Sequence, residues 1–346
     1  MKILVTGASG FIGSHVVQQL HREGHQVVLS YREGKSNWRL FDSIAKVYSQ
    51  KTTTTGENSH HDSGMVKLKH SLTQYAERIL PYSFKDSAIH FHDSFEKVSF
   101  DLIDFDEVLD AVGSVKFDAV VHCAAIISFH PKDRDRMLRD NVEGTRNIIN
   151  TCLKHGIERF YHVSSIAALG RPVEDGPITL DTPWEENSPY NTDYALSKYY
   201  AELEVWRGKE EGLKVKLFYP GVVLGEGDGN TSSKQVIDVV KSGNKFYPMG
   251  SNGFVFVEDL AKKIIDSIGK DEPQERFLCV SHNLSFKTLI DQIALSYGYK
   301  SAIWPLKGFL YHAVYGVARF CEILGIKIPI TSELMRSTSK ESVYQD

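Results

Sequence analysis

A tyrosine and a lysine spaced for one helix face could act together in acid–base chemistry. Tyr194 and Lys198 stand in the run Tyr-Ala-Leu-Ser-Lys, and residues four apart on a helix are neighbours. A phenol has an ordinary pKa of about 10, and a nearby ammonium group favours the phenolate and lowers that pKa. The pair therefore predicts a side chain that gives or takes a proton at a substrate oxygen.

Two adjacent serines lie upstream of this pair. Ser164 ends the run 159–164, which the pattern predicts as a strand, and Ser165 follows it directly. Parallel sheets bind their ligands at the carboxyl ends of strands, so a hydroxyl here could hold a substrate oxygen against the tyrosine. The alternative is that both serines only cap a turn.

Three evenly spaced glycines come directly after the first predicted strand. Gly7, Gly10 and Gly13 lie in the run Gly-Ala-Ser-Gly-Phe-Ile-Gly, which opens a predicted helix. A helix N-terminus offers free N–H groups to phosphates, and glycines let the backbone turn sharply and approach them. A tight turn without a ligand is the alternative, but the position between strand and helix favours a dinucleotide pyrophosphate site.

The elements that must position these residues alternate regularly. Predicted strands are 2–6, 26–31, 97–101, 118–122, 159–164, 214–219 and 276–280, and predicted helices are 11–23, 104–112, 136–154, 193–211, 259–268, 285–297 and 305–324. This alternation predicts an α/β fold, a doubly wound parallel sheet (Rossmann-like) with a smaller mixed C-terminal substrate-binding part. We expect residues 1–175 to form the dinucleotide-binding domain, together with about 193–222 and 255–280. Residues 176–346 then form mainly the substrate-binding part.

The segment 33–96 is longer than an ordinary connection. It predicts two helices, 37–49 and 65–80, around the polar tract 50–61. Its histidines, His60, His61, His70, His90 and His92, have no convincing ligand spacing, so we expect no metal site. The role of this insert stays open.

Composition excludes several classes of protein. The chain has 346 residues and a net charge of −4, which gives no electrostatic reason to expect nucleic acid. No apolar run approaches the roughly 18 residues of a membrane span. The four cysteines form no C-x-x-C pair and the first residues do not look like a signal peptide, so we expect a reduced, cytoplasmic protein. The aromatic segment 303–330 is expected to be core or substrate pocket, with a membrane surface as the alternative.

In combination these motifs resemble the extended short-chain dehydrogenases/reductases, the NAD-dependent epimerase/dehydratase family. The glycine turn after Thr6, the Tyr194–Lys198 pair and the segment 254–261 occur in the family's order. The resemblance covers about 1–32 and 97–290, and the pattern is closest to dihydroflavonol 4-reductase-like proteins. The insert at 33–96 is not part of the common pattern.

The resemblance implies roles for individual residues. In the family the catalytic serine stands five residues before a glycine that matches Gly170, which selects Ser165 over Ser164. Asn141 matches a helix asparagine that helps to position the lysine. Without the resemblance, Asn141 would be interpreted as a helix cap. The implied cofactor-binding residues are Gly7, Ser9, Gly10, Phe11, Ile12, Gly13, Arg32, Asp101, Leu102, Ala124, Ala125, Tyr194, Lys198, Pro220 and Val223. The implied substrate residues are Ser128, Phe129 and His130. Relatives also pair as homodimers through helices corresponding to 141–154 and 194–211.

The residues after the second strand bear on the choice of dinucleotide. Arg32 could meet a 2′-phosphate, whereas Glu33 could bind ribose hydroxyls; its place beyond the strand favours a solvated acid. We therefore expect NADP, with NAD as the alternative. The predicted activity is hydride transfer to or from a carbonyl/alcohol carbon of a small organic substrate, with Tyr194 as acid or base. The alternatives are a nucleotide-sugar epimerase with the same triad and a non-catalytic NAD(P)-binding sensor.

Overall fold

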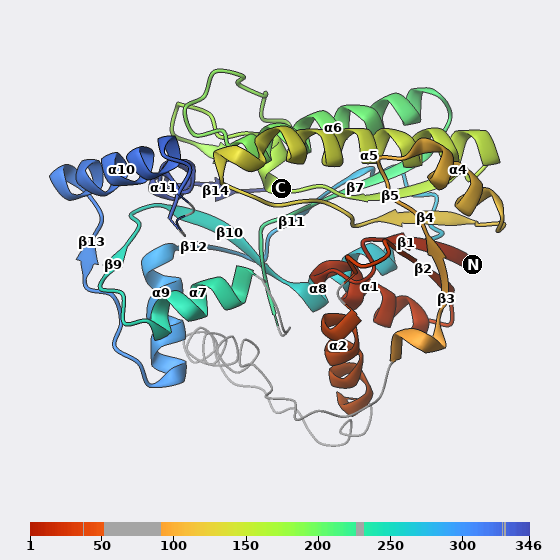
Figure 1. Cartoon of the computed structure of the whole chain (residues 1–346), viewed down its shortest axis with the longest axis horizontal. Helices are drawn as coiled ribbons and strands as arrows, with labels where there is room; N and C mark the ends of the chain where they lie inside the picture. The colour runs from red at the N-terminus through yellow and green to blue at the C-terminus, as the bar shows by residue number, and fades with distance from the viewer. Residues whose placement is uncertain (37, 52–90, 226–231, 327, 329) are drawn as a thin grey trace.

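A seven-stranded parallel sheet forms the centre of the protein (Figure 1). The computed structural model describes residues 1–36, 38–51, 91–225, 232–326, 328 and 330–346. The strand order is β11-β7-β5-β4-β1-β2-β3. The strands are β1 (Lys2–Thr6), β2 (Gln26–Tyr31), β3 (Glu96–Ser99), β4 (Ala119–His122), β5 (Arg159–Val163), β7 (Lys214–Pro220) and β11 (Arg276–Cys279). Each predicted strand is confirmed, with its ends shifted by at most two residues.

Helices cover both faces of this sheet, as a doubly wound fold requires. One face is covered by α1 (Phe11–Arg22), α2 (Trp38–Lys51) and α8 (Val257–Asp266), and the other by α4 (Phe105–Gly113), α5 (Arg134–His155) and α6 (Asp193–Glu210). Within β1 the side chains alternate: Ile3 and Val5 enter the first core, whereas Leu4 enters the second. Both faces of the strand are therefore buried, which explains its continuous apolar run.

The strand order places the chemically active segments together. The chain leaves β1 toward β2 on one side, and β4 pairs with β1 on the other. Ligands of such sheets bind in the crevice beyond the carboxyl ends of the strands where the order reverses. The glycine turn after β1, the loop after β4 and the serines after β5 all lie at this edge.

A smaller mixed sheet supplies the second part of the molecule. It consists of β8 (Val222–Leu224), β10 (Ser251–Phe256) and β12 (His282–Ser285), where β10 pairs parallel with β8 and antiparallel with β12. The helices α7 (Ser232–Lys241) and α9 (Phe286–Tyr297) belong to this part, and Phe254, Phe256 and Leu289 share a separate core there. Short parallel pairs join β9 (Phe246–Tyr247) to β13 (Trp304–Pro305) and β6 (Pro177–Ile178) to β14 (Val343–Tyr344). The domain boundary near residue 175 stays a prediction.

Part of the insert is described. The helix predicted at 37–49 is confirmed as α2. The helix predicted at 65–80, the rest of the polar tract beyond residue 51 and the histidines 60, 61, 70 and 90 lie outside the described residues. His92, in the 3₁₀ turn η1 (Phe91–Ser94), hydrogen-bonds Asp42 at 2.9 Å and stacks on Trp38, with ring centroids 4.9 Å apart. This histidine ties the end of the insert back to α2, which forms its first part.

The prediction that the C-terminal aromatic segment is core is wrong for three of its residues. Trp304, Phe309 and Phe320 are 56%, 90% and 63% exposed. The helix α10 (Gly308–Ile323) instead packs through the opposite side, where Ala318 and Glu322 are buried. Glu322 accepts hydrogen bonds from Ser332 at the start of α11 (Ser332–Ser339), and this anchor fixes which side of α10 faces inward.

Candidate functional site

The glycine turn brings the start of α1 close to two strand ends. Gly7 has a φ of 67°, a left-handed conformation that favours glycine, and a Cβ there would lie 2.7 Å from the backbone nitrogen of Ala124. A Cβ on Gly13 would clash with the carbonyl oxygen of Gly7. The Gly10 N–H donates to that same oxygen at 2.9 Å. The turn can therefore keep this shape only with glycine at both positions 7 and 13.

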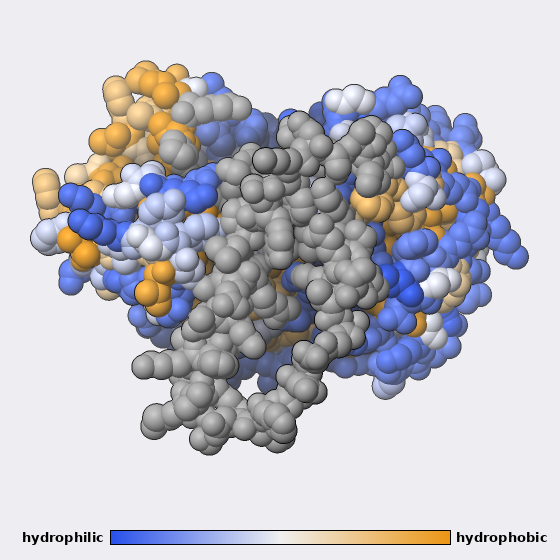
Figure 2. All heavy atoms as spheres, turned by 90° about the horizontal axis from the view of Figure 1, so that it is seen from below, coloured by the Kyte–Doolittle hydropathy of each residue, from blue (hydrophilic) through white to orange (hydrophobic). Residues whose placement is uncertain are grey.

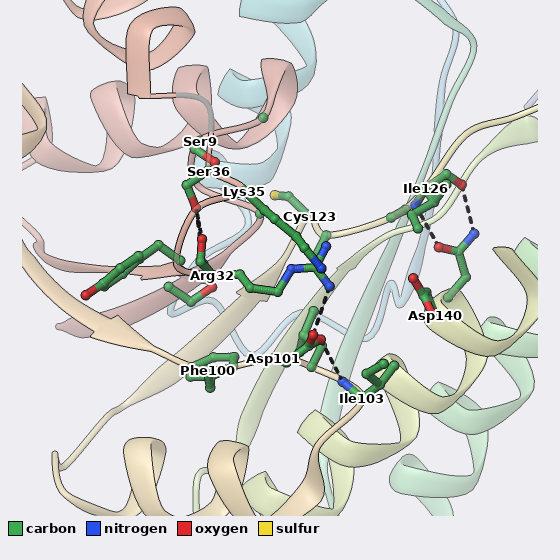
Figure 3. Close-up of a pocket in the computed structure, with 18 residues that line it drawn as sticks. Ser9, Arg32, Lys35, Ser36, Phe100, Asp101, Ile103, Cys123, Ile126 and Asp140 are labelled. Carbon is green, nitrogen blue, oxygen red and sulfur yellow. Dashed lines mark hydrogen bonds and ion pairs between the residues drawn. The ribbon is translucent and has the colours of Figure 1, made fainter. Parts of the chain in front are cut away.

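A cavity of about 300 Å³ opens beside this turn (Figure 3). Its lining includes the predicted residues Gly7, Ser9, Gly10, Arg32, Asp101, Leu102, Ala124, Ala125 and Asn141. The residues fit the adenosine and pyrophosphate end of a dinucleotide, because a helix N-terminus, a glycine cradle and cations meet in one hollow of ligand size.

The other predicted cofactor residues lie elsewhere around the turn. Phe11 and Ile12 pack against the core beneath the sheet. Pro220 ends β7 and Val223 lies in β8, and both are buried. None of these four lines the cavity, and neither does Tyr194 or Lys198.

Arg32 and Asp101 contact each other across the cavity. The Arg32 Nη1 atom lies 2.9 Å from Asp101 Oδ2, and both side chains are about one-third exposed (31% and 28%). Two further residues, Lys35 and Ser36, line the same wall, and the Arg32 backbone N–H donates to Ser36 Oγ at 3.1 Å. Lys35 and Ser36 were not predicted as site residues, although both lie within four residues of Arg32. Glu33 is exposed and does not line the cavity.

The structure brings Ser165 to Tyr194 and turns Ser164 away. The Ser165 hydroxyl lies close enough to the Tyr194 hydroxyl to lower its pKa, and Ser165 Oγ accepts from the Ala167 N–H at 3.1 Å, which caps the 3₁₀ turn η3 (Ile166–Leu169). Ser164 Oγ donates to Glu202 on the other side of the backbone. The capping role and the contact with the tyrosine, treated above as alternatives, are both made by Ser165.

Lys198 is buried directly behind this pair. Its Nζ donates to the Val163 carbonyl oxygen at 2.9 Å, and only 2% of the residue is exposed. Burial lowers the pKa of Lys198 to about 8, and the nearby Glu202 carboxylate opposes that shift. Lys198 therefore loses its proton more easily than a solvated lysine does.

The pKa of Tyr194 shifts in the direction opposite to the one predicted from its spacing with Lys198. Burial raises the pKa of Tyr194 above its ordinary value, and the hydrogen bond from Ser165 is what opposes the increase. The prediction that the lysine lowers the pKa of Tyr194 is wrong for this arrangement, because desolvation of the phenolate outweighs the effects of its neighbours.

Asn141 connects the loop after β4 with α6. Its Nδ2 donates to the Ile126 carbonyl oxygen and to Ser197 Oγ, both at 2.9 Å, and its Oδ1 accepts from the Ile126 N–H at 2.7 Å. It lies inside α5, which begins at Arg134, so the helix-cap alternative is wrong. Ser197 immediately precedes Lys198, and Asn141 thereby holds the lysine's segment of α6.

The three predicted substrate residues divide into two kinds. The Phe129 ring meets the Tyr194 ring edge-on, with centroids 6.2 Å apart. Ser128 Oγ donates to Asp133 at 2.8 Å, and His130 Nδ1 accepts from the Lys132 N–H at 3.2 Å. Phe129 therefore borders Tyr194, whereas Ser128 and His130 shape the turn η2 (Pro131–Asp133) beside it.

Two buried histidines lie beneath the site and were not singled out from the sequence. His122 hydrogen-bonds Thr6 at 2.6 Å and Thr145 at 3.1 Å, and its ring stacks on His162. Burial, aided by Lys198, lowers the pKa of His122 to about 3, and burial also lowers the pKa of His162. Both rings are therefore neutral, which leaves Lys198 as the titrating group of this cluster.

The described ranges contain neither a candidate metal site nor a membrane span. Within those residues, histidines, cysteines and acids form no cluster of three that could hold a metal ion. Within the same residues no helix has both the length and the apolar character that crossing a bilayer demands.

Comparisons with known proteins agree with this geometry. The NAD dependent epimerase/dehydratase family matches residues 3–277. Tetraketide alpha-pyrone reductase 1 of Arabidopsis thaliana is 25% identical over 308 residues, covering 86% of this chain and 81% of the relative. A putative dihydroflavonol 4-reductase of Synechocystis is 36% identical over 110 residues, 31% of each chain.

A solved structure shares the fold. UDP-glucose 4-epimerase of Thermotoga maritima, determined with UDP-glucose, superimposes with a TM-score of 0.64 at 17% identity, covering 98% of this chain and 97% of the other. The chain is an NAD(P)-dependent enzyme of the extended short-chain dehydrogenase/reductase type and belongs to the NAD dependent epimerase/dehydratase family.

Proposed function

We propose that the protein is an NADP(H)-dependent oxidoreductase that transfers a hydride to or from a carbonyl/alcohol carbon of a small organic substrate, in the manner of dihydroflavonol reductases. The observation that carries the proposal is the placement of the Ser165 hydroxyl beside the Tyr194 hydroxyl, whose pKa it lowers, with Lys198 buried against the end of β5 that carries Ser165. These residues lie at the same sheet edge as the glycine turn, so one bound dinucleotide can extend from the cavity toward them.

The roles of the chain's own residues follow from their positions. The nicotinamide, when bound, supplies or accepts the hydride. The Ser165 and Tyr194 hydroxyls hold the substrate oxygen between them, and Tyr194 gives or takes the proton at that oxygen. Lys198, with its lowered pKa, is placed to hold the cofactor ribose and to pass a proton onward. Phe129 packs edge-on against the Tyr194 ring and would form one wall beside the substrate.

The direct test is consumption of NADPH by the purified protein with a panel of ketones and dihydroflavonols. We expect the absorbance of NADPH to fall with at least one of them. Interconversion of UDP-glucose without net loss of NADPH would instead identify an epimerase. Tight NADPH binding without turnover on either panel would identify a dinucleotide sensor, and both results contradict the proposal.

The preference for NADP is part of this proposal. Arg32, Lys35 and Ser36 place two cations and a hydroxyl on the wall beside β2, where a 2′-phosphate can form charge-assisted hydrogen bonds. Asp101 lies against Arg32 and would repel a phosphate if the arginine were absent. The wall therefore suits NADP better than NAD.

Replacing Arg32 by alanine should weaken NADPH binding about 10- to 100-fold, the value of one or two hydrogen bonds to a charged group. NADH binding should change much less, because NADH lacks the phosphate. Titration of both dinucleotides by fluorescence measures the ratio. The control is Arg159→Ala, an arginine at the amino end of β5 that pairs with Asp271 and lies outside the cavity. An unchanged NADPH-to-NADH ratio in R32A would contradict the NADP assignment.

We also propose a cytoplasmic homodimer that pairs through α5 and α6. These two helices lie side by side on one face of the sheet (Figure 1). On α6, Tyr200 and Leu203 are exposed, at 37% and 46%, which leaves apolar surface for a second copy.

A further inference from the structure

The outer side of α10 carries an apolar surface that faces solvent. Phe309, Val317, Phe320, Ile323 and Leu324, here called the α10 face, are between 58% and 90% exposed. Their spacing returns to one side of the helix every three or four residues. The helix is therefore amphipathic, with its apolar stripe turned outward rather than toward a core.

This orientation is fixed by the inner side of the helix. Glu322 is 8% exposed, and its carboxylate accepts from the Ser332 N–H at 2.7 Å and from Ser332 Oγ at 2.8 Å. Arg319 adds an ion pair at 3.2 Å from the same carboxylate. Burying a carboxylate costs free energy, and so does exposing a phenylalanine to water. The second cost disappears if the outer side of the helix contacts an apolar medium.

The apolar surface extends beyond the helix. Ile303 and Trp304 precede it and are 64% and 56% exposed, and Ile326 follows it at 49%. The Trp304 N–H donates to the Lys245 carbonyl oxygen at 2.8 Å, so the strand pairing of β13 with β9 holds this segment in place. Figure 2 shows hydrophobic residues gathered at this end of the molecule. A patch of this kind marks an interaction surface.

Cations outnumber acids along the segment that carries the patch. Among the described residues of the segment 298–326, the exposed ionised side chains are Lys300, Lys307 and Arg319, whereas the acid Glu322 is buried. Lys132 joins them, because its Nζ donates to the Gly325 carbonyl oxygen at 3.1 Å. The chain as a whole is acidic, with a net charge of −4, so this end is locally basic and complements an anionic surface.

The length of α10 decides how it can meet a membrane. Its 16 residues give a helix about 24 Å long at about 1.5 Å per residue, shorter than the bilayer core of about 30 Å. Aromatic and branched side chains on one side with lysine and arginine at the rim are typical of helices that lie in the interface plane.

We propose that the α10 face binds the surface of an anionic phospholipid bilayer, with Phe309 and Phe320 inserted at the headgroup–acyl boundary and the rim cations against lipid phosphates. A second copy of the chain fits this surface less well. A symmetric pair brings each patch against itself, and the rim cations of both copies would then crowd one interface.

Sedimentation with vesicles tests the proposal on the full chain. We expect the wild-type protein to bind an equal mixture of phosphatidylcholine and phosphatidylglycerol at least tenfold more tightly than phosphatidylcholine alone. The double variant F309S/F320S should lose about tenfold or more in affinity, since two aromatic rings no longer leave water. K300E/K307E should lose binding to the mixed vesicles. Val173→Ser, which removes a 55% exposed valine in the loop before β6, is the matched control and should bind as wild type does.

Each variant is also checked for an unchanged melting temperature and NADPH affinity. A loss of vesicle binding can then be distinguished from a loss of folding. Absence of wild-type binding, equal binding to both kinds of vesicle, or full binding by F309S/F320S would each overturn the proposal. If gel filtration shows that F309S/F320S abolishes self-association while no protein binds vesicles, the face pairs with a second copy instead, and the proposal is wrong.

Discussion

Replacing Tyr194 by phenylalanine should lower kcat about 100- to 10,000-fold, the range that a positioned acid or base contributes. The substitution removes only the hydroxyl that Ser165 contacts. The ring and its edge-on contact with Phe129 remain, and the tyrosine does not line the cavity beside the glycine turn. The dissociation constant for NADPH should therefore stay nearly unchanged.

Steady-state kinetics and a fluorescence titration of NADPH measure the two quantities separately. Tyr199→Phe is the matched control, because Tyr199 lies on the same helix and stacks on Trp184 with ring centroids 4.3 Å apart. Its ring keeps that stack after the change, and turnover should be that of wild type. Turnover that survives in Y194F would rule out Tyr194 as the acid or base.

Replacing Gly13 by alanine should weaken dinucleotide binding by about 100-fold and destabilise the fold by about 1–3 kcal/mol, the usual cost of overpacking. The added methyl group would clash with the Gly7 carbonyl oxygen, a backbone atom that cannot rotate away. Either α1 or the turn must then shift, and both shape the cavity. The loss of NADPH affinity in this variant should be larger than the loss expected from its lower folding stability alone.

Thermal unfolding and NADPH titration of G13A provide the measurement. Gly176→Ala is the control, because a Cβ at Gly176 would meet nothing within 4 Å. That variant should keep both its melting temperature and its NADPH affinity. NADPH affinity at the wild-type value in G13A would contradict the view that contact between residues 7 and 13 shapes the phosphate site.

The strands were predictable from sequence where their hydrophobic pattern reflects their burial in the central sheet. Strands such as β1 and β4 are buried on both faces, so their apolar runs are continuous and easily distinguished from amphipathic helices. The sheet of β8, β10 and β12 was not predicted, because its short strands gain their stability from pairing across many residues of sequence. Spacing identified the stripe on α10 but not which side of the helix packs inward; the buried contact between Glu322 and Ser332 decides that.

In the site, too, some features could be predicted from the sequence and others required the fold. The positions of Tyr194, Lys198 and the glycines could be read from spacing, whereas the protonation of Tyr194 depends on desolvation, which sequence does not reveal. The separate directions of Ser164 and Ser165 follow from strand alternation, yet only the fold shows that Glu202 receives the first and Tyr194 the second. Lys35 and Ser36 lie on the cavity wall because the chain turns back at Gly34.

The Asn141 side chain links the cavity wall to the segment of α6 that carries Lys198. It forms part of the cavity wall and at the same time holds both the loop at Ile126 and the helix at Ser197. A ligand that moves this wall therefore changes the energy of the segment carrying Lys198, and any change at that segment alters the affinity for the ligand by the same factor. If a ligand displaces Asn141, this single amide couples occupancy of the cavity to the alignment of the lysine.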